Sequence, residues 1–304
     1  MPLRSRFRGL TERSGVLIEG PGGWGEFSPF SDYSPERAGR WLAAAIESAA
    51  GKWPEPRRTS VPVNATIPAL PPEEAARLAM TSACSTVKVK VGDSQDVDRV
   101  AAVRAALGPA ARIRIDVNAA WDLQTARERL AALVRYDLEY AEQPVATVDD
   151  MRRLRKVVDV PLAADESLRL APDPLRIDLR DAADLLVLKV HPLGGVRRAL
   201  QVAEAHGLPV VVSSALETSV GLAAGVALAA CLDDLPYACG LGTALLLDGD
   251  VVTDPLVPVD GAVAVRRPAV EVTRLNGFEV LLHDALAPRH GAVLRDAVTA
   301  PRFP

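Results

Sequence analysis

From residue 61 onward, the sequence alternates between short β-branched runs and longer segments rich in Ala, Arg and Leu. The runs are typical of buried strands, and the longer segments have the apolar spacing of amphipathic helices. Strands that alternate with helices predict a parallel sheet with helices packed on it. Eight runs have strand character: VPVNATIPA (61–69), TVKVKVG (86–92), RIRIDVNA (112–119), LEYAEQP (138–144), PLAADES (161–167), DLLVLKVHP (184–192), PVVVSSALE (209–217) and YACGLG (237–242).

Eight such units predict an α/β fold with a closed (β/α)8-type barrel. An open doubly wound sheet is the alternative, but no GxGxxG motif follows a first strand. The segment between the fifth and sixth runs, 172–180, is the weakest helix because it contains two prolines.

The two ends of the chain do not continue this repeat. Residues 1–33 predict a short antiparallel meander with a hairpin turn at PGGWG, and 34–50 predict a helix with Ser34 as N-cap and Pro35 in the first turn. We expect residues 1–60 and the tail 263–304 to form one α+β capping domain, and residues 61–262 to form the barrel domain.

Composition excludes several classes of protein. The chain has 304 residues, a net charge of −4 with interspersed signs, and no run of 18 apolar residues. These features predict a cytoplasmic protein without membrane or nucleic-acid partners, and MPLRSRFRGL lacks the apolar core of a secretory signal. The odd set Cys84, Cys231 and Cys239 predicts buried structural thiols. The oligomeric state is left open, a monomer included.

Lysine is scarce in this chain, with 5 Lys against 30 Arg. Three of these lysines, Lys88, Lys90 and Lys189, lie within strand-like runs. Lysine changes its pKa readily when buried and arginine does not, so the choice of lysine at these positions indicates chemistry. Lys88 and Lys90 share one face of their strand, which by itself could be either solvent or the barrel interior.

Polar residues recur at the same phase of successive runs. Barrel enzymes carry their active sites at the carboxyl ends of the strands, where these residues fall. They are Lys90, Asp116, Glu142, Asp165 followed by Glu166, Lys189, and Ser213 followed by Ser214. The spacing from each run to the next is 23 to 26 residues, and this regularity places the lysine pair in the interior.

These residue types predict a metal-assisted proton transfer. Three carboxylates without His or Cys suit Mg²⁺, or Mn²⁺ as a substitute. The second and sixth strands of an eight-stranded barrel lie opposite each other, so Lys90 and Lys189 should face each other across the mouth. A cation flanked by two lysines suits removal of a proton next to a carboxylate, with the cation stabilising the enediolate. We expect burial, Lys88 and the cation to lower the pKa of the lysine base.

The motifs KVKVG, IDVNAAWD, EQP, ADES and LKVHPLGG resemble the enolase superfamily, muconate-lactonising subgroup. PVNATIPA, GWGEF and VVSSALETSVGLAAGVALAA resemble, within it, the o-succinylbenzoate synthase family of the short actinobacterial type. The resemblance runs over most of the chain and is weakest after residue 265. It implies dehydration of 2-succinyl-6-hydroxycyclohexa-2,4-diene-1-carboxylate to o-succinylbenzoate, a step of menaquinone synthesis.

Motif matching assigns the roles that the resemblance implies. Asp116, Glu142 and Asp165 would be the metal ligands, and Lys90 would be the acid/base residue. Lys189 would hold the opposite face of the substrate, as a second acid/base group or as a cation. Lys88, one pleat deeper, is expected to act as a fixed charge that lowers the pKa of Lys90, or to hold the substrate carboxylate.

Several neighbouring residues have weaker claims. Asn118 could bond the substrate carboxylate or a metal-bound water, and Glu166 could orient a lysine or a ligand. Ser213 and Ser214, with the amides at the start of the next helix, could receive a second substrate carboxylate. His191 is interpreted as structural, and the DGD at 248–250 as a loop.

Two alternative functions remain open at this level. Two opposed lysines also suit an N-acylamino acid racemase, such as an N-succinylamino acid racemase, or a dipeptide epimerase. A Schiff-base aldolase would use Lys189 as the imine-forming residue, but the three carboxylates argue against it.

Overall fold

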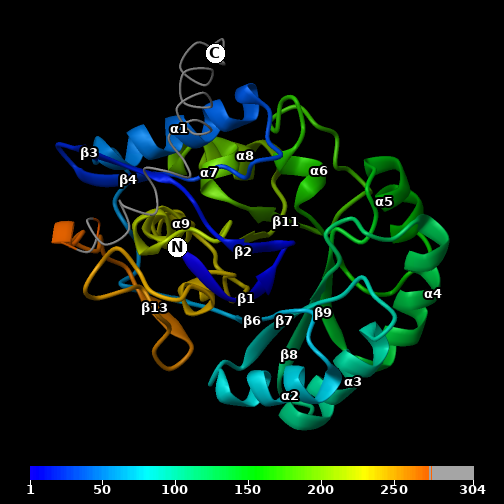
Figure 1. Ribbon diagram of the computed structural model, residues 1–304. Helices are drawn as coiled ribbons and strands as arrows, with labels where there is room; N and C mark the ends of the chain where they lie inside the picture. Colours follow the sequence, from blue (N-terminus) through cyan, green and yellow to red (C-terminus); the bar gives the residue numbers. More distant parts are fainter. Residues whose placement is uncertain (274, 276–304) are drawn as a thin grey trace.

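The computed structural model describes residues 1–273 and 275. Its centre is a curled seven-stranded parallel sheet in the order β12-β11-β10-β9-β8-β7-β6, with helices around its outside (Figure 1). The strands are β6 (Ala65–Ile67), β7 (Thr86–Lys90), β8 (Arg112–Asp116), β9 (Leu138–Glu142), β10 (Leu162–Ala164), β11 (Leu185–Leu188) and β12 (Val210–Val212). The predicted barrel is thus confirmed for seven of the eight runs.

The eighth run closes the barrel without forming a strand of its own. Cys239 makes a parallel bridge to Val63, just before β6, and Gly240 makes one to Ser213, just after β12. The Gly240 amide donates to the Val212 carbonyl at 2.8 Å. Residues 237–242 therefore connect the two edges of the sheet through a few hydrogen bonds.

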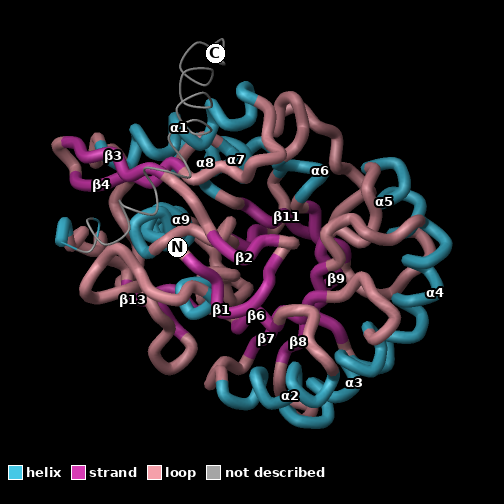
Figure 2. The backbone as a smooth tube through the Cα atoms, viewed as in Figure 1, coloured by secondary structure: helices cyan, strands magenta, loops and turns pink. Residues whose placement is uncertain are grey.

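Helices cover the outer face of the sheet, as the tube view in Figure 2 shows. They are α2 (Pro72–Thr81), α3 (Asp96–Leu107), α4 (Leu123–Leu133), α5 (Val148–Arg155), α6 (Glu166–Arg169), α7 (Val190–Leu193), α8 (Val196–His206) and α9 (Ser219–Cys231). Asp122 caps α4 by accepting from the Thr125 amide at 2.7 Å. The Pro-containing segment 172–180, expected to be the weakest of the helices, forms no helix.

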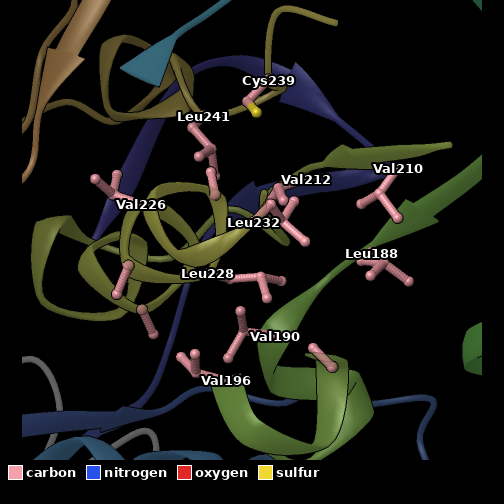
Figure 3. Packing of buried hydrophobic residues seen from close by; sticks show 14 of the residues in the cluster. Leu188, Val190, Val196, Val210, Val212, Val226, Leu228, Leu232, Cys239 and Leu241 are labelled. Carbon is pink, nitrogen blue, oxygen red and sulfur yellow. The ribbon is translucent and has the colours of Figure 1, made fainter. Parts of the chain in front are cut away.

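The core lies between the sheet and this helical layer. Val87 and Val89 of β7 are fully buried in a cluster with Ala75 of α2 and Val100 of α3. The valines of TVKVKVG therefore face the helices, so Lys88 and Lys90 face the barrel interior. On the far side, α9 is buried along its whole length, and Leu228 packs beside Val190 and Val212 (Figure 3).

A second layer covers one side of the barrel mouth. Its elements are β1 (Pro2–Phe7), β2 (Leu10–Glu12), β3 (Val16–Gly20), β4 (Gly23–Phe27) and α1 (Pro35–Ala49). β1 pairs with β2 and β3 with β4, both antiparallel, so the predicted meander consists of two hairpins. Ser34 occupies the N-cap position of α1, with Pro35 next, but its side chain makes no capping hydrogen bond.

After the barrel, β13 (Ala262–Ala264) pairs with β5 (Ser60–Pro62). Arg267 then donates to the carbonyls of Gly22 and Ser48, at 3.0 and 2.8 Å. The domain boundaries at residues 60 and 262 stay predictions, and most of the tail expected to join the cap lies outside the described residues. Within the described part of the chain, no helix has both the length and the apolar character needed to cross a membrane.

Candidate active site

The register of three neighbouring strands brings Lys90, Asp116 and Glu142 to one level. Lys90 is opposite Asp116 in the β7–β8 pairing, and Asp116 is opposite Glu142 in the β8–β9 pairing. Lys90 Nζ lies 2.5 Å from Asp116 Oδ2. Lys88 Nζ, one pleat deeper, lies 2.8 Å from Glu142 Oε2 and 3.3 Å from Asp116 Oδ2. Two lysines and two carboxylates therefore form one continuous cluster, in which Lys88, Asp116 and Glu142 are buried and Lys90 is partly exposed.

Asp165 and Lys189 continue this cluster on the next strands. Asp165 follows β10 directly and is the N-cap residue of the short helix α6. Its Oδ2 accepts from Lys189 Nζ at 2.7 Å, and its Oδ1 accepts from Arg169 Nε at 2.9 Å. Asp165 is thus held by two cations, one directly after β11 and one from its own helical turn.

One cavity connects the two predicted acid/base lysines. β7 and β11 are separated by three strands in the sheet order, so Lys90 and Lys189 approach from different sides of the curled sheet. Both line this cavity together with Asp116, Ser213 and residues of the capping layer. A substrate in the cavity would have one lysine on each side.

The two lysines of KVKVG differ electrostatically. Burial lowers the pKa of Lys90, and the neighbouring Lys88 lowers it further, against the opposing effect of Asp116. Burial also acts on Lys88, but there Glu142 and Asp116 prevail and raise the pKa. The expected asymmetry is present: the pKa of Lys88 is raised, so it stays charged, whereas the pKa of Lys90 is lowered, so Lys90 gives up its proton more easily than Lys88.

The carboxylates respond to the same neighbours. Burial and the nearby Asp116 raise the pKa of Glu142 to about 7. Despite burial, Lys90 and Lys88 hold the pKa of Asp116 well below its usual range. Arg169 and Lys189 likewise hold the pKa of Asp165 below its usual range, although burial acts to raise it.

The three carboxylates fit a divalent cation chemically. Among the described residues, no three acidic, imidazole or thiol groups are grouped as a ready-made metal site, because the carboxylates are turned toward the lysines. Glu142 Oε1, however, is buried and has no hydrogen-bond partner. A buried carboxylate oxygen without a partner is costly unless a cation or donor reaches it. All three carboxylates offer oxygen donors, which is the set that Mg²⁺ prefers.

Asn118 and Glu166 extend the hydrogen-bond network. Asn118 Oδ1 accepts from Lys90 Nζ at 2.7 Å, and its Nδ2 donates to Glu166 Oε1 at 3.1 Å. The same Glu166 oxygen accepts from Arg169 at 2.6 Å. Asn118 has a positive φ of 50°, a conformation that asparagine tolerates better than most residues. Lys90 is thereby linked to the α6 turn through two polar side chains.

Ser213 and Ser214 both line the cavity, as expected of substrate contacts. The expectation about the helix amides was wrong. Glu26 of the capping layer accepts from the Thr218 amide at 3.0 Å and the Gly221 amide at 3.1 Å, while Asp250 accepts from the Ser219 amide at 3.1 Å. Carboxylates of the chain itself therefore satisfy the start of α9.

His191 is structural in its contacts, as the sequence suggested. It is 1% exposed, its Nδ1 lies 3.1 Å from Glu217 Oε1, and its ring is 5.4 Å from that of Trp41 in α1. The DGD segment forms a loop, as expected, and its last residue, Asp250, is buried because it caps α9.

Two basic residues of the interior were not singled out from the sequence. Arg169 is four residues after Asp165 and three after Glu166, a helical spacing that could have identified it. Arg114 is two residues before Asp116 on the same strand face, and it is fully buried beside Tyr140 and Glu139. Its position could have been inferred from the same alternation that places Lys88.

Comparison with known proteins defines the class first. A family model described as enolase C-terminal domain-like matches residues 72–269, and one described as enolase N-terminal domain-like matches residues 1–49. The muconate lactonizing enzyme from Pseudomonas fluorescens has a similar structure, with a TM-score of 0.79 at 22% identity, covering 91% of this chain and 94% of that chain. A dipeptide epimerase from Enterococcus faecalis, complexed with Mg and a dipeptide, has a TM-score of 0.73 at 23% identity over 85% of this chain and 90% of its own. The chain belongs to the enolase superfamily, and its fold is that of the superfamily.

Sequence similarity then narrows the family. The o-succinylbenzoate synthase of Thermobifida fusca is 59% identical over 285 residues, which are 92% of this chain and 90% of that protein. The chain belongs to the o-succinylbenzoate synthase family.

Proposed function

We propose that this protein dehydrates 2-succinyl-6-hydroxycyclohexa-2,4-diene-1-carboxylate to o-succinylbenzoate, a metal-dependent lyase reaction of menaquinone synthesis. The observation that supports this most directly, in a chain of this family, is the cavity lined by Lys90, Lys189 and Asp116. The other two carboxylates are buried against lysines of the same cavity, Glu142 against Lys88 and Asp165 against Lys189. We further propose that the enzyme acts on this small carboxylate in the cytoplasm.

Asp116, Glu142 and Asp165 would hold Mg²⁺, with Mn²⁺ as a substitute. The bound cation would supply positive charge that stabilises the enediolate formed when a proton leaves the carbon next to the substrate carboxylate. The Lys88 and Lys189 ammonium groups now occupy oxygens of these carboxylates, so both lysines also keep the ligand set neutralised.

Lys90 is the proposed base. Its Nζ takes the proton from C1 of the ring, and the electron pair of that C–H bond passes into the enediolate. The pair then forms the new ring double bond as the C6–O bond breaks, and the departing hydroxide takes the proton back from Lys90 to leave as water. Asn118, 2.7 Å from Lys90 Nζ, keeps the amine directed at the cavity. Aromatisation of the ring favours the product.

Lys189 approaches from the other side of the cavity. As an ammonium group it stabilises the negative charge of the enediolate without exchanging a proton. Ser213 and Ser214 line the same wall and offer hydroxyl groups to the substrate, and Glu166 orients Asn118.

The test is a conversion assay with the purified protein, followed by absorbance as the diene becomes aromatic. We expect turnover with Mg²⁺, loss of activity on chelation, and recovery when Mg²⁺ is restored. The two opposed lysines would also suit racemisation of N-succinylamino acids, so this reaction is measured in parallel. A racemase kcat/KM well above the dehydratase value, or turnover that survives chelation, would overturn the proposal.

A further inference from the structure

The proposed reaction leaves one end of its substrate without a partner. The ring carboxylate would be bound by the lysines and by the cation that the three carboxylates hold. The succinyl tail ends in a second carboxylate, to which no partner has yet been assigned. The wall of the cavity that the capping layer contributes includes Phe7, Arg8, Phe30 and Tyr33. We propose that Arg8, at the tip of the β1–β2 hairpin, binds the tail carboxylate. This assignment rests on the proposed function and adds a recognition residue to it.

Charge pairing distinguishes Arg8 from the other basic side chains that line the cavity. Each of the others contacts a buried carboxylate of the barrel. They are Lys88 and Lys90 with Asp116, and Arg169 and Lys189 with Asp165. Arg8 instead lies 3.6 Å from Asp32 Oδ2, whose side chain is 67% exposed. An ion pair at that distance and exposure is weak, so an incoming carboxylate can replace Asp32.

The hairpin holds Arg8 in a defined place. Phe7 pairs with Leu10, so Arg8 and Gly9 form a two-residue turn, with φ of 51° and 76°. Turns with two positive φ values favour Asn, Asp or Gly at the first position. The backbone therefore gives no reason for arginine here, and the reason must lie in what its side chain contacts.

Two aromatic rings position the hairpin tip over the cavity. The Arg8 guanidinium carbon lies 4.1 Å from the centre of the Phe30 ring, and Lys90 Nζ lies 5.1 Å from that of Phe7. Stacking on Phe30 restricts the guanidinium while leaving its N–H groups free to point sideways. A planar guanidinium held in this way is suited to grip a carboxylate with two parallel hydrogen bonds.

The site therefore binds the two carboxylates of its substrate at two separate positions. Lys90 and the metal ligands meet the ring carboxylate in the barrel, while Arg8 meets the tail carboxylate at the cap. Because the tail does not react, Arg8 contributes to binding in the ground state and the transition state alike, and its loss should appear in KM rather than in kcat.

The experiment compares Arg8→Gln with wild type and with Arg176→Gln. Arg176 has an 88% exposed side chain and does not line the cavity, so its variant controls for the loss of one positive charge. We expect Arg8→Gln to raise KM by roughly tenfold, about 1.4 kcal/mol, with kcat within twofold. Asp32→Asn should leave KM unchanged or lower it. An unchanged KM in Arg8→Gln, or an equal rise in Arg176→Gln or Asp32→Asn, would overturn the assignment.

A binding measurement isolates the tail carboxylate. Calorimetric titration with o-succinylbenzoate and with 2-butanoylbenzoate compares ligands that differ only in that group. Arg8→Gln should weaken the binding of o-succinylbenzoate by about tenfold and that of 2-butanoylbenzoate by less than twofold. Equal weakening of both ligands would refute the role of Arg8. Thermal unfolding checks that the variant is folded. If the wild type does not convert the substrate, the proposed function fails, and the Arg8 assignment fails with it. If the wild type converts the substrate but Arg8→Gln binds and turns it over equally well, the Arg8 assignment alone fails.

Discussion

Lys88→Met tests the proposed charge cluster through stability rather than activity. The side chain of Lys88 is 6% exposed, and its ammonium group neutralises Asp116 and Glu142, which are almost completely buried. Methionine keeps most of the volume and removes the charge. In metal-free protein, the two carboxylates then face each other without the cation between them.

Removing one partner of a buried ion pair typically costs about 3–5 kcal/mol. Protonation of Glu142 limits this cost, because its pKa is already raised to about 7. A group whose pKa is higher in the folded protein stabilises the fold below its unfolded value, near 4.5, and this stability is lost as the pH rises through about 7. Loss of Lys88 raises this pKa further, so the defect should be near 3 kcal/mol at pH 8 and smaller at pH 6.

The assay is thermal unfolding in EDTA at pH 6 and pH 8, followed by titration with Mg²⁺. For a chain of this size, about 3 kcal/mol corresponds to a fall in Tm of roughly 5 °C. Lys156→Met is the matched control, since Lys156 is exposed at the end of α5. Because a divalent cation can take the place of the ammonium group, Mg²⁺ should raise the Tm of Lys88→Met by more than that of wild type. A variant as stable as the control, or one that gains no more from Mg²⁺ than wild type, would refute the reasoning.

Three further outcomes follow from the contacts. Arg169→Met removes a cation that orients Asp165, so Mg²⁺ affinity measured by calorimetry should fall by about tenfold; unchanged affinity would contradict that role. Glu26→Ala takes away the acceptor of the Thr218 amide at the start of α9, and should reduce the free energy of unfolding by about 1–3 kcal/mol in urea titration, whereas an unaltered midpoint would argue against the cap. Leu228→Ala opens a cavity in the core of Figure 3 and should cost about 2–5 kcal/mol in the same titration, with a smaller loss indicating collapse of the cavity.

The barrel and the level of its polar residues could be predicted because both follow from local periodicity. Alternation along TVKVKVG fixes the relative faces of lysine and valine, and one polar residue per βα unit fixes a common level. The register confirms this for Lys90, Asp116 and Glu142, which are directly opposite one another. The sequence could not show how residues 237–242 pair. They bridge to residues beside both edge strands of the sheet, and these edges come together only when the barrel closes.

Contacts between distant segments could not be predicted from the sequence. Glu26 and Gly221 are 195 positions apart, and no local pattern indicates that the capping layer satisfies the amides of α9. The same holds for Arg8, whose place at the cavity depends on how the hairpin packs over the barrel. The sequence predicted three carboxylates at one site, but their pairing with three lysines depends on side-chain orientations that spacing does not determine.

The most direct test of the proposed mechanism is single-turnover dehydration by Lys90→Arg. Arginine keeps the positive charge beside Asp116 but cannot accept the proton, so the rate should fall by about 10³-fold or more, while calorimetry shows Mg²⁺ binding retained. A rate within tenfold of wild type would contradict the assignment of Lys90 as the base.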